Sequence, residues 1–181
     1  MQTERSPLRL ILMRHAKSDW SHEDLSDHDR PLNDRGKRDA PRVADWLAEN
    51  RLVPDLILCS SAARTQETCA LMLNRLESAS KVFVSKRLYL AAPQTIFSVI
   101  AEDAIMPDKE SAPATVLVLA HNPGVSEAAG WLMGQMVAMP TAALVAFHFQ
   151  GDRWHDSVCP EMTEHLATMT PKALGGDGRR S

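Results

Sequence analysis

The sequence predicts a single α/β domain, a sandwich in which helices cover a mostly parallel sheet. Short apolar segments rich in β-branched residues alternate with segments whose apolar residues recur at helical spacing, the pattern of α/β folds. The segment 115–120 is apolar almost throughout, as expected for a strand covered on both faces. With 181 residues and 44% hydrophobic content, the chain suits one hydrophobic core.

The first predicted strand is the apolar run 10–13, which ends abruptly in Arg14 and His15. In open α/β sheets, ligands bind beyond the carboxyl ends of the strands, so a charged pair at this position indicates a functional edge. The segment 18–34 that follows is polar and has no periodicity. We expect a long loop there, and loops of this length in compact domains are often functional.

A helical pattern begins at Asn33, with one apolar face that suits packing on the core. Pro41 interrupts this pattern. Because proline removes a backbone donor and clashes with the preceding turn, we expect it either to kink the helix or to lie in the first turn of a helix that starts later. The apolar face consists of Ala40, Val43, Ala44 and Leu47.

The middle of the chain repeats the alternation of strand and helix. A strand at 55–59 stops at Ser60 and Ser61, which are suited to cap a helix, and Arg64 lies in or next to the first turn of that helix. A strand at 81–85 follows, and Pro93 begins another helix because proline is favoured in the first turn.

The last third of the chain begins with a connector at 102–114. The strand 115–120 ends in His121, and a helix through 125–133 and a strand at 142–150 are expected after it. The segment 154–169 is left open, because its pattern favours neither a packed helix nor a loop over the surface.

Composition excludes several classes of protein. The net charge of −3 gives no polybasic face for nucleic acid or an anionic membrane, and no apolar stretch is long enough to span a bilayer. The three cysteines form no Cys-x-x-Cys pair, so neither a disulfide framework nor a zinc site is indicated. We expect a soluble cytoplasmic protein with one domain at 8–169, flexible termini at 1–7 and 170–181, and no cofactor.

Charged or titratable side chains follow three predicted strands. The pair Arg14 and His15 follows the first strand, Arg64 comes shortly after the second, and His121 ends the strand 115–120. Because the carboxyl ends of parallel strands meet at one edge of the sheet, we expect these four side chains to converge. Two arginines and two histidines with no carboxylate cluster close behind them describe an anion pocket. A phosphoryl group fits it, because guanidinium groups bind phosphate oxygens through two parallel hydrogen bonds.

A histidine in such a pocket can also act as a nucleophile. The unperturbed pKa of histidine, near 6.5, leaves a neutral fraction at pH 7, so His15 is predicted to accept a phosphoryl group on one ring nitrogen. Arg14, Arg64 and a protonated His121 would then neutralise the charge that develops on the phosphoryl oxygens, and water would complete the cycle.

Four ordered sequence blocks resemble the histidine phosphatase superfamily. They are Met-Arg-His-Ala-Lys-Ser at 13–18, the block 29–36, the block 59–68 around Arg64, and Leu-Ala-His-Asn-Pro-Gly at 119–124. Within the superfamily the chain looks like the small SixA-type phosphohistidine phosphatases, with similarity over residues 8 to 150. The resemblance implies a three-layer α/β/α sandwich of the kind seen in phosphoglycerate mutases, and so makes 8–169 one histidine phosphatase domain.

The resemblance also implies the roles of the site residues. His15 would be the phosphorylated nucleophile, and Arg14, Arg64 and His121 would form the phosphate pocket. Lys17 and Ser18 match positions near the phosphate. The implied activity is that of a metal-independent phosphatase whose substrate is a phosphorylated protein, through phosphohistidine, or a small phosphorylated molecule.

The chain departs from the family pattern in the segment 88–91. Relatives place a glutamate after the tyrosine there as general acid or base, whereas this chain has Leu90. A positioned acid is typically worth 10² to 10⁴-fold in rate, so an alcohol leaving group would suffer from its loss. A histidine leaving group would suffer less, because imidazole can depart neutral once its other nitrogen is protonated. Asp19, Glu23 and Asp24 are candidate substitutes for the missing acid.

Two alternatives have a basis in the sequence. The segments 22–24 and 27–29 combine histidine with carboxylates, which suits a metal-dependent phosphohydrolase, although a solvated loop is the favoured interpretation. Leu90 in place of the acid would suit a non-catalytic phosphate-binding or regulatory module. A module that only binds phosphate has no need of a nucleophile such as His15, which argues against the second alternative.

Overall fold

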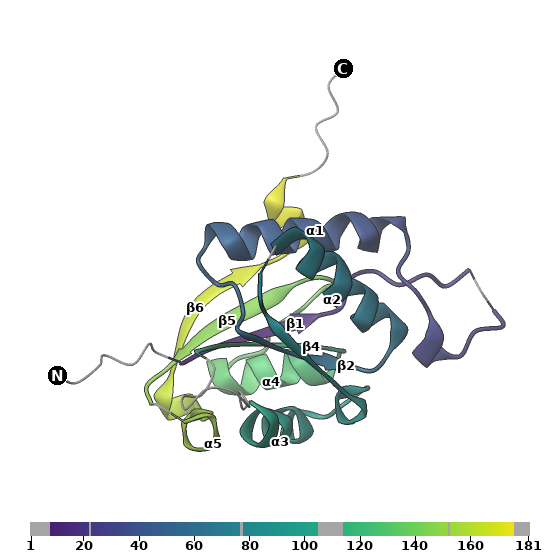
Figure 1. Ribbon diagram of the computed structural model, residues 1–181. Helices are drawn as coiled ribbons and strands as arrows, with labels where there is room; N and C mark the ends of the chain where they lie inside the picture. The colour runs from purple at the N-terminus through teal and green to yellow at the C-terminus, as the bar shows by residue number, and fades with distance from the viewer. Residues whose placement is uncertain (1–7, 22, 77, 105–113, 152, 176–181) are drawn as a thin grey trace.

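The computed structural model describes residues 8–21, 23–76, 78–104, 114–151 and 153–175. Figure 1 shows a central sheet with helices above and below it. The flexible terminus expected at 1–7, most of the connector and residues 176–181 lie outside the described residues.

One six-stranded sheet organises the molecule, in the order β3-β2-β4-β1-β5-β6. The neighbours β3, β2, β4 and β1 are parallel, whereas β5 runs antiparallel to both β1 and β6, so the sheet is mixed. The strands are β1 (Leu8–Arg14), β2 (Leu56–Ser60), β3 (Lys81–Ser85), β4 (Thr115–Ala120), β5 (Leu144–Phe149) and β6 (Thr163–Met169).

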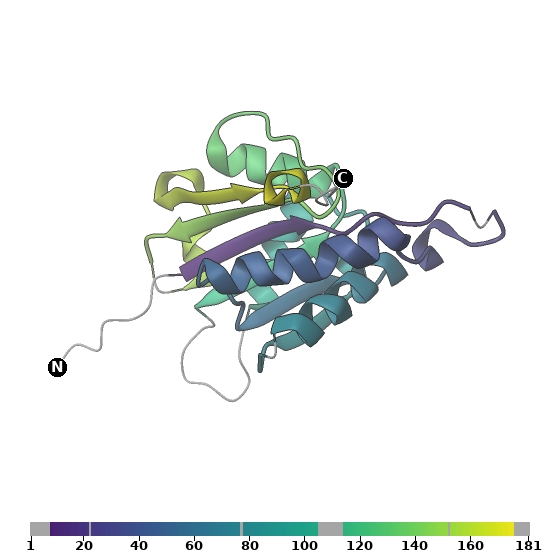
Figure 2. The ribbon, with the colours of Figure 1, turned by 90° about the horizontal axis from the view of Figure 1, so that it is seen from above.

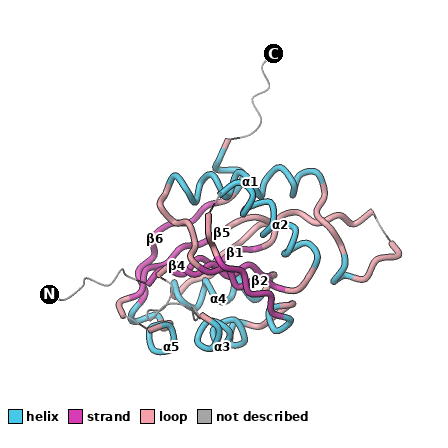
Figure 3. The backbone as a smooth tube through the Cα atoms, in the orientation of Figure 1, coloured by secondary structure: helices cyan, strands magenta, loops and turns pink. Residues whose placement is uncertain are grey.

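Helices cover both faces of this sheet, which confirms the predicted three-layer sandwich. The helices α1 (Asp34–Glu49) and α2 (Ala63–Leu76) lie side by side on one face, as Figure 2 shows from above. The helices α3 (Pro93–Asp103), α4 (Gly124–Met133) and α5 (Trp154–Ser157) lie on the other face (Figure 3).

Alternation along β1 explains why both faces are covered. Leu10 and Leu12 belong to the hydrophobic cluster on the side of α3 and α4, whereas Ile11 and Met13 belong to the cluster under α1 and α2. All four side chains are fully buried. Successive residues of a strand point to opposite faces, so a continuous apolar run needs a layer on each side.

The helix α1 starts where the sequence indicates. The side chain of Asn33 accepts a hydrogen bond from the backbone N–H of Gly36 at 2.9 Å, which caps the first turn. Of the two alternatives expected at Pro41, the later start of the helix is wrong. The helix begins at Asp34 and continues through Pro41 to Glu49. Packing of the buried apolar face on the core outweighs the single backbone hydrogen bond that proline removes.

The C-terminal segment differs most from the sequence expectation. The sequence pattern did not decide the structure of the segment 154–169. Its second half, Thr163–Met169, forms β6 at the edge of the sheet beside β5. Beyond it a 3-10 helix (Pro171–Leu174) packs against α1, with Pro171 buried, and Arg42 donates a hydrogen bond to the carbonyl of Gly175 at 2.5 Å. Contacts with α1 thus continue beyond residue 169, through Pro171 and Gly175, and the flexible terminus expected from residue 170 stays a prediction.

Two glycines allow close approaches near the end of the sheet at which β1 and β4 finish. A Cβ atom at Gly36 would lie 2.3 Å from the carbonyl oxygen of Lys17, and one at Gly124 would lie 1.9 Å from that of Ala91. Both distances are far below van der Waals contact. Glycine therefore lets α1 and α4 begin directly against the segments that border the functional edge.

Candidate active site

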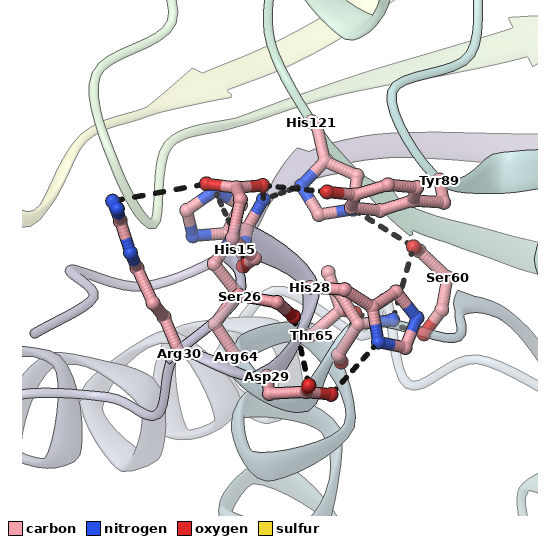
Figure 4. A network of polar contacts seen from close by, with 12 residues as sticks. His15, Ser26, His28, Asp29, Arg30, Ser60, Arg64, Thr65, Tyr89 and His121 are labelled. Atoms are coloured by element: carbon pink, nitrogen blue, oxygen red, sulfur yellow. Dashed lines mark hydrogen bonds and ion pairs between the residues drawn. The ribbon is translucent and has the colours of Figure 1, made fainter. Parts of the chain in front are cut away.

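The four residues predicted to converge do so at the carboxyl ends of three neighbouring strands. Arg14 ends β1 and His15 follows it, Arg64 is the second residue of α2 just after β2, and His121 follows β4. Because β2, β4 and β1 are adjacent and parallel, their ends meet at one edge (Figure 4). The side chains of His15, Arg64 and His121 are at least 94% buried.

The backbone and ring of His15 are held by several hydrogen bonds. Its backbone N–H donates to the carbonyl of Ala120 at 3.1 Å, and its carbonyl accepts from Ala142 at 3.0 Å. Its ring Nδ1 lies 2.7 Å from the carbonyl oxygen of Ala16. A carbonyl can only accept, so Nδ1 carries the proton and the lone pair is on Nε2. The tautomer that a nucleophile needs is therefore set by one backbone group.

The guanidinium of Arg64 faces both histidines. Its Nε lies 3.3 Å from Nε2 of His15, and one terminal nitrogen lies 3.3 Å from Nδ1 of His121. Because arginine can only donate, Nδ1 of His121 accepts, and Nε2 of His121 donates to the hydroxyl of Ser60 at 2.8 Å. Ser60 thus contacts the pocket instead of serving mainly as a helix cap, since its hydroxyl is 3.5 Å from the nearest backbone donor at Ala62.

Both histidines are neutral at pH 7 in this structure. Burial, with smaller contributions from Arg64 and Arg14, lowers the pKa of His15 to about 4, although the hydrogen bond to Ala16 opposes the shift. Burial, together with His15 and Arg64, lowers the pKa of His121 to about 3. Without an anion His121 is therefore neutral, because a buried imidazole beside cations resists gaining a proton. The protonated His121 expected beside a bound phosphoryl group stays a prediction.

Arg14 leaves one donor available for an anion. One terminal nitrogen donates to the carbonyl of Met139 at 3.1 Å, and Nε is buried without a hydrogen-bond partner in the part of the chain that the structure describes. Burial and the charge of Arg64 lower the pKa of Arg14 below its ordinary value. A half-buried cation with a buried, unused N–H next to a second arginine suits the binding of a phosphate oxygen.

A carboxylate that the sequence marked only as a candidate metal ligand lies in the same network. Asp27, from the 3-10 helix Asp27–Asp29, accepts from a terminal nitrogen of Arg64 at 2.9 Å and from the hydroxyl of Tyr89 at 2.7 Å. The ring of Tyr89 packs edge-on against the ring of His121, with centroids 5.5 Å apart. The expected pocket without carboxylates is therefore corrected to include Asp27. No periodicity marks Asp27 in the sequence, because the fold of the 18–34 loop brings it in.

Three carboxylates are the candidate substitutes for the missing acid. Asp19 accepts from the backbone N–H of Ser21 at 2.8 Å, and Glu23 and Asp24 are exposed. Leu90 is 54% exposed and adopts a left-handed backbone conformation with φ of 49°. Its side chain supplies no titratable group.

Lys17 and Ser18 link β1 to α1 through their backbones. The carbonyl of Lys17 accepts from the N–H of Asn33 at 3.0 Å, and Ser18, which is buried, pairs with Leu32 in an isolated antiparallel bridge. Among the contacts of the described residues, none joins either side chain to Arg14, His15, Arg64 or His121. Their predicted role near the phosphate stays a prediction.

The segments that suggested a metal site make other contacts. Within the described ranges, no three His, Cys, Asp or Glu side chains lie close enough to share a metal ion, and His22 lies outside those ranges. His28 contacts Asp29 at 3.2 Å and the hydroxyl of Ser61 at 3.0 Å.

In the described ranges, no helix has the length and apolar character needed to cross a bilayer.

Comparisons with known proteins agree with this geometry. A model of the histidine phosphatase superfamily (branch 1) matches residues 10–89. An uncharacterised chloroplastic protein of Arabidopsis thaliana is 34% identical over 154 residues, which cover 82% of this chain and 70% of that protein. An uncharacterised protein of Mycobacterium leprae is 32% identical over 155 residues, which cover 78% of this chain and 89% of that protein.

A solved structure extends the similarity over nearly the whole chain. The crystal structure of a protein from Agrobacterium tumefaciens, assigned as the phosphohistidine phosphatase SixA, superposes with a TM-score of 0.75 at 26% identity, and the match covers 91% of this chain and 99% of that one. Together with the convergent arginines and histidines, these similarities support a phosphatase. The chain belongs to the histidine phosphatase superfamily.

Proposed function

We propose that this phosphatase transfers the phosphoryl group of its substrate to Nε2 of His15 and then to water, and that its substrate is phosphohistidine on a protein. One observation carries the proposal. The hydrogen bond from Nδ1 of His15 to the carbonyl of Ala16 leaves Nε2 unprotonated, facing Arg64 and within the field of Arg14. A neutral, oriented imidazole beside fixed cations has the properties of a phosphoryl acceptor.

In the first step, Nε2 of His15 attacks phosphorus as the bond to the leaving group breaks, and the bonding electron pair stays with the leaving group. Arg64 and the unused Nε of Arg14 stabilise the negative charge on the phosphoryl oxygens. The proton on Nδ1 of His15 stays in place, held by Ala16, so the phosphorylated ring is a cation that is easily displaced.

In the second step, water attacks phosphorus and His15 leaves as a neutral imidazole. No proton has to reach His15, because Nδ1 has kept its own. The leaving group of the substrate, in contrast, has no proton of its own if it is an alcohol, and Leu90 cannot protonate it. A phosphoramidate avoids this difficulty, because an imidazole whose distal nitrogen is protonated departs neutral. The neutral departure of imidazole and the name of the Agrobacterium relative favour phosphohistidine over a phosphate ester.

Metal independence is part of the proposal, because arginines supply the positive charge that a metal ion would otherwise provide. The test is hydrolysis of phosphohistidine and of 4-nitrophenyl phosphate by the wild type and by His15→Ala, with and without EDTA. Radiolabelled enzyme is trapped by acid and by alkali quenching in parallel.

Activity that survives EDTA, disappears in His15→Ala and leaves an alkali-stable, acid-labile label is the expected result. Loss of activity in EDTA would instead support the metal-dependent phosphohydrolase. Tight binding of phosphate without turnover or label would support the non-catalytic phosphate-binding module.

A further inference from the structure

Asp27 lies on the solvent-exposed side of the site, whereas the catalytic groups are buried. The side chain of Asp27 is 43% exposed, and that of Arg64, which it contacts, is 5% exposed. His15 and His121, which Arg64 also contacts, are buried. The carboxylate of Asp27 accepts a hydrogen bond from the hydroxyl of Tyr89 at 2.7 Å, and Figure 4 shows the ring of Tyr89 next to that of His121.

The direction of attack places the leaving group on this solvent-exposed side. Phosphoryl transfer is roughly in line, so the leaving group departs on the side of phosphorus opposite to the nucleophile. Because Nε2 belongs to a buried residue, the leaving group faces the solvent-exposed side of the site, where Asp27 lies. Asp27 is the acidic side chain that joins the network of His15, Arg64 and His121 at that side, in the part of the chain that the structure describes.

The hydrogen bonds of Asp27 define it as an acceptor. Its Oδ2 atom accepts from Tyr89 at 2.7 Å and from Arg64 at 2.9 Å, and Oδ1 lies 3.8 Å from a terminal nitrogen of Arg30. The hydrogen bond from Tyr89, followed by the contact with Arg64, holds the pKa of Asp27 below its ordinary value. A carboxylate held in this form cannot replace the missing glutamate as a proton donor, but it can stabilise positive charge.

We propose that Asp27 selects for a leaving group that carries an N–H, by accepting a hydrogen bond from the distal ring nitrogen of a phosphorylated imidazole. This inference rests on the function proposed above and names a specificity-determining residue for it. The carboxylate favours the form of the substrate in which the distal nitrogen is protonated, because opposite charges at hydrogen-bond distance stabilise each other.

The step balances without any proton from the protein. The bond from Nε2 of His15 to phosphorus forms, and the bond from phosphorus to the substrate nitrogen breaks. Its electron pair returns to that nitrogen, and the positive charge of the substrate ring is neutralised. The imidazole leaves neutral with its proton on the distal nitrogen beside Asp27. His15, whose Nδ1 proton bonds to Ala16, goes through the same change in the second step.

For a phosphate ester, Asp27 is expected to destabilise the transition state instead of stabilising it. The leaving oxygen of the ester gains negative charge in the transition state, and a carboxylate nearby raises the energy of that charge. The same group therefore assists an imidazole and hinders an alkoxide. The diagnostic quantity is the ratio of kcat/KM for a phosphoramidate to kcat/KM for an ester.

The experiment compares wild type, Asp27→Asn and Asp29→Asn on N-phosphoimidazole and on 4-nitrophenyl phosphate. Asp29 is a matched control, since it is an exposed carboxylate in the same 3-10 helix that bonds Ser26 and His28. Hydrogen bonds to charged groups predict a fall of about 10- to 100-fold in the ratio for Asp27→Asn. The ratio for Asp29→Asn is expected to equal that of the wild type.

Two results would overturn the inference, and they can be told apart. If Asp27→Asn changes kcat/KM equally for both substrates, Asp27 only positions Arg64 and Tyr89, and the specificity role fails while the proposed function stands. If the wild type turns over the ester alone, or if His15→Ala keeps its activity, the proposed function itself fails. Inclusion of His15→Ala in every series separates these cases.

Discussion

The backbone N–H of Ala16 donates to Oγ1 of Thr68 at 3.1 Å, and the same hydroxyl donates to the carbonyl of Arg64 at 2.6 Å. One buried threonine in α2 thus connects the residue after the nucleophile to the backbone of the arginine that faces it. The hydrogen bond between Arg64 and His15 depends on this connection, because it sets the position of α2 relative to the end of β1.

Thr68→Val should therefore destabilise the protein and lower its activity together. Valine keeps the volume but leaves the N–H of Ala16 buried without a partner, which costs about 1–3 kcal/mol. The free energy of unfolding from urea titration measures the loss. Thr68→Ser, which keeps the hydroxyl, is expected to restore most of it, and equal stability of the valine variant and the wild type would contradict the role given to the hydroxyl.

Arg64→Lys should remove most of the activity while leaving the fold intact. Lysine keeps the charge but lacks the planar group that contacts both His15 and His121, so kcat/KM should fall by about 100- to 1000-fold. Arg75→Lys, in the same helix and exposed, serves as the control and should retain activity. A loss of less than tenfold in Arg64→Lys would show that charge alone suffices.

The acid limb of kcat/KM should lie near pH 4. His15 must be neutral to attack, and its pKa is lowered to about 4, so activity should be constant from pH 7 to about 5 and fall below that. An acid limb near pH 6.5 would mean that the free enzyme does not bury His15 as the structure shows.

The free energy of unfolding should fall as the pH is lowered, over a range that overlaps the acid limb of kcat/KM. The unfolded chain binds a proton on each histidine near pH 6.5, whereas His15 and His121 stay neutral in the folded state down to about pH 4 and about pH 3. Their contribution to stability is therefore present above pH 6.5 and is lost as the pH falls toward these values. Circular dichroism at each pH separates this unfolding from the titration of the nucleophile.

Gly36→Ala should destabilise the junction between β1 and α1. The added Cβ would lie 2.3 Å from the carbonyl oxygen of Lys17, a backbone atom that cannot move aside alone, so we expect a loss of about 1–3 kcal/mol. Lys37→Ala, at an exposed position in the same turn, is the matched control and should change the free energy of unfolding by less than about 1 kcal/mol. A stabilised Gly36→Ala variant would show that α1 can shift.

The sequence alone was sufficient to predict the layers of the fold and the convergence of four residues at the candidate site. Leu10 and Ile11 are both apolar because the strand that holds them is covered on both faces, and this pattern is local. Arg14, His15, Arg64 and His121 follow strands directly, so a parallel sheet brings them to one edge whatever the details of the loops.

The contribution of Asp27 and the protonation state of His121 were decided by the tertiary structure alone. Asp27 and Tyr89 are 62 positions apart, and their hydrogen bond depends on the path of an aperiodic loop. The pKa of His121 depends on its burial and on neighbours from three other segments, which no local pattern encodes. Periodicity reports which face of an element is buried, whereas the charge of a site depends on which distant groups exclude water around it.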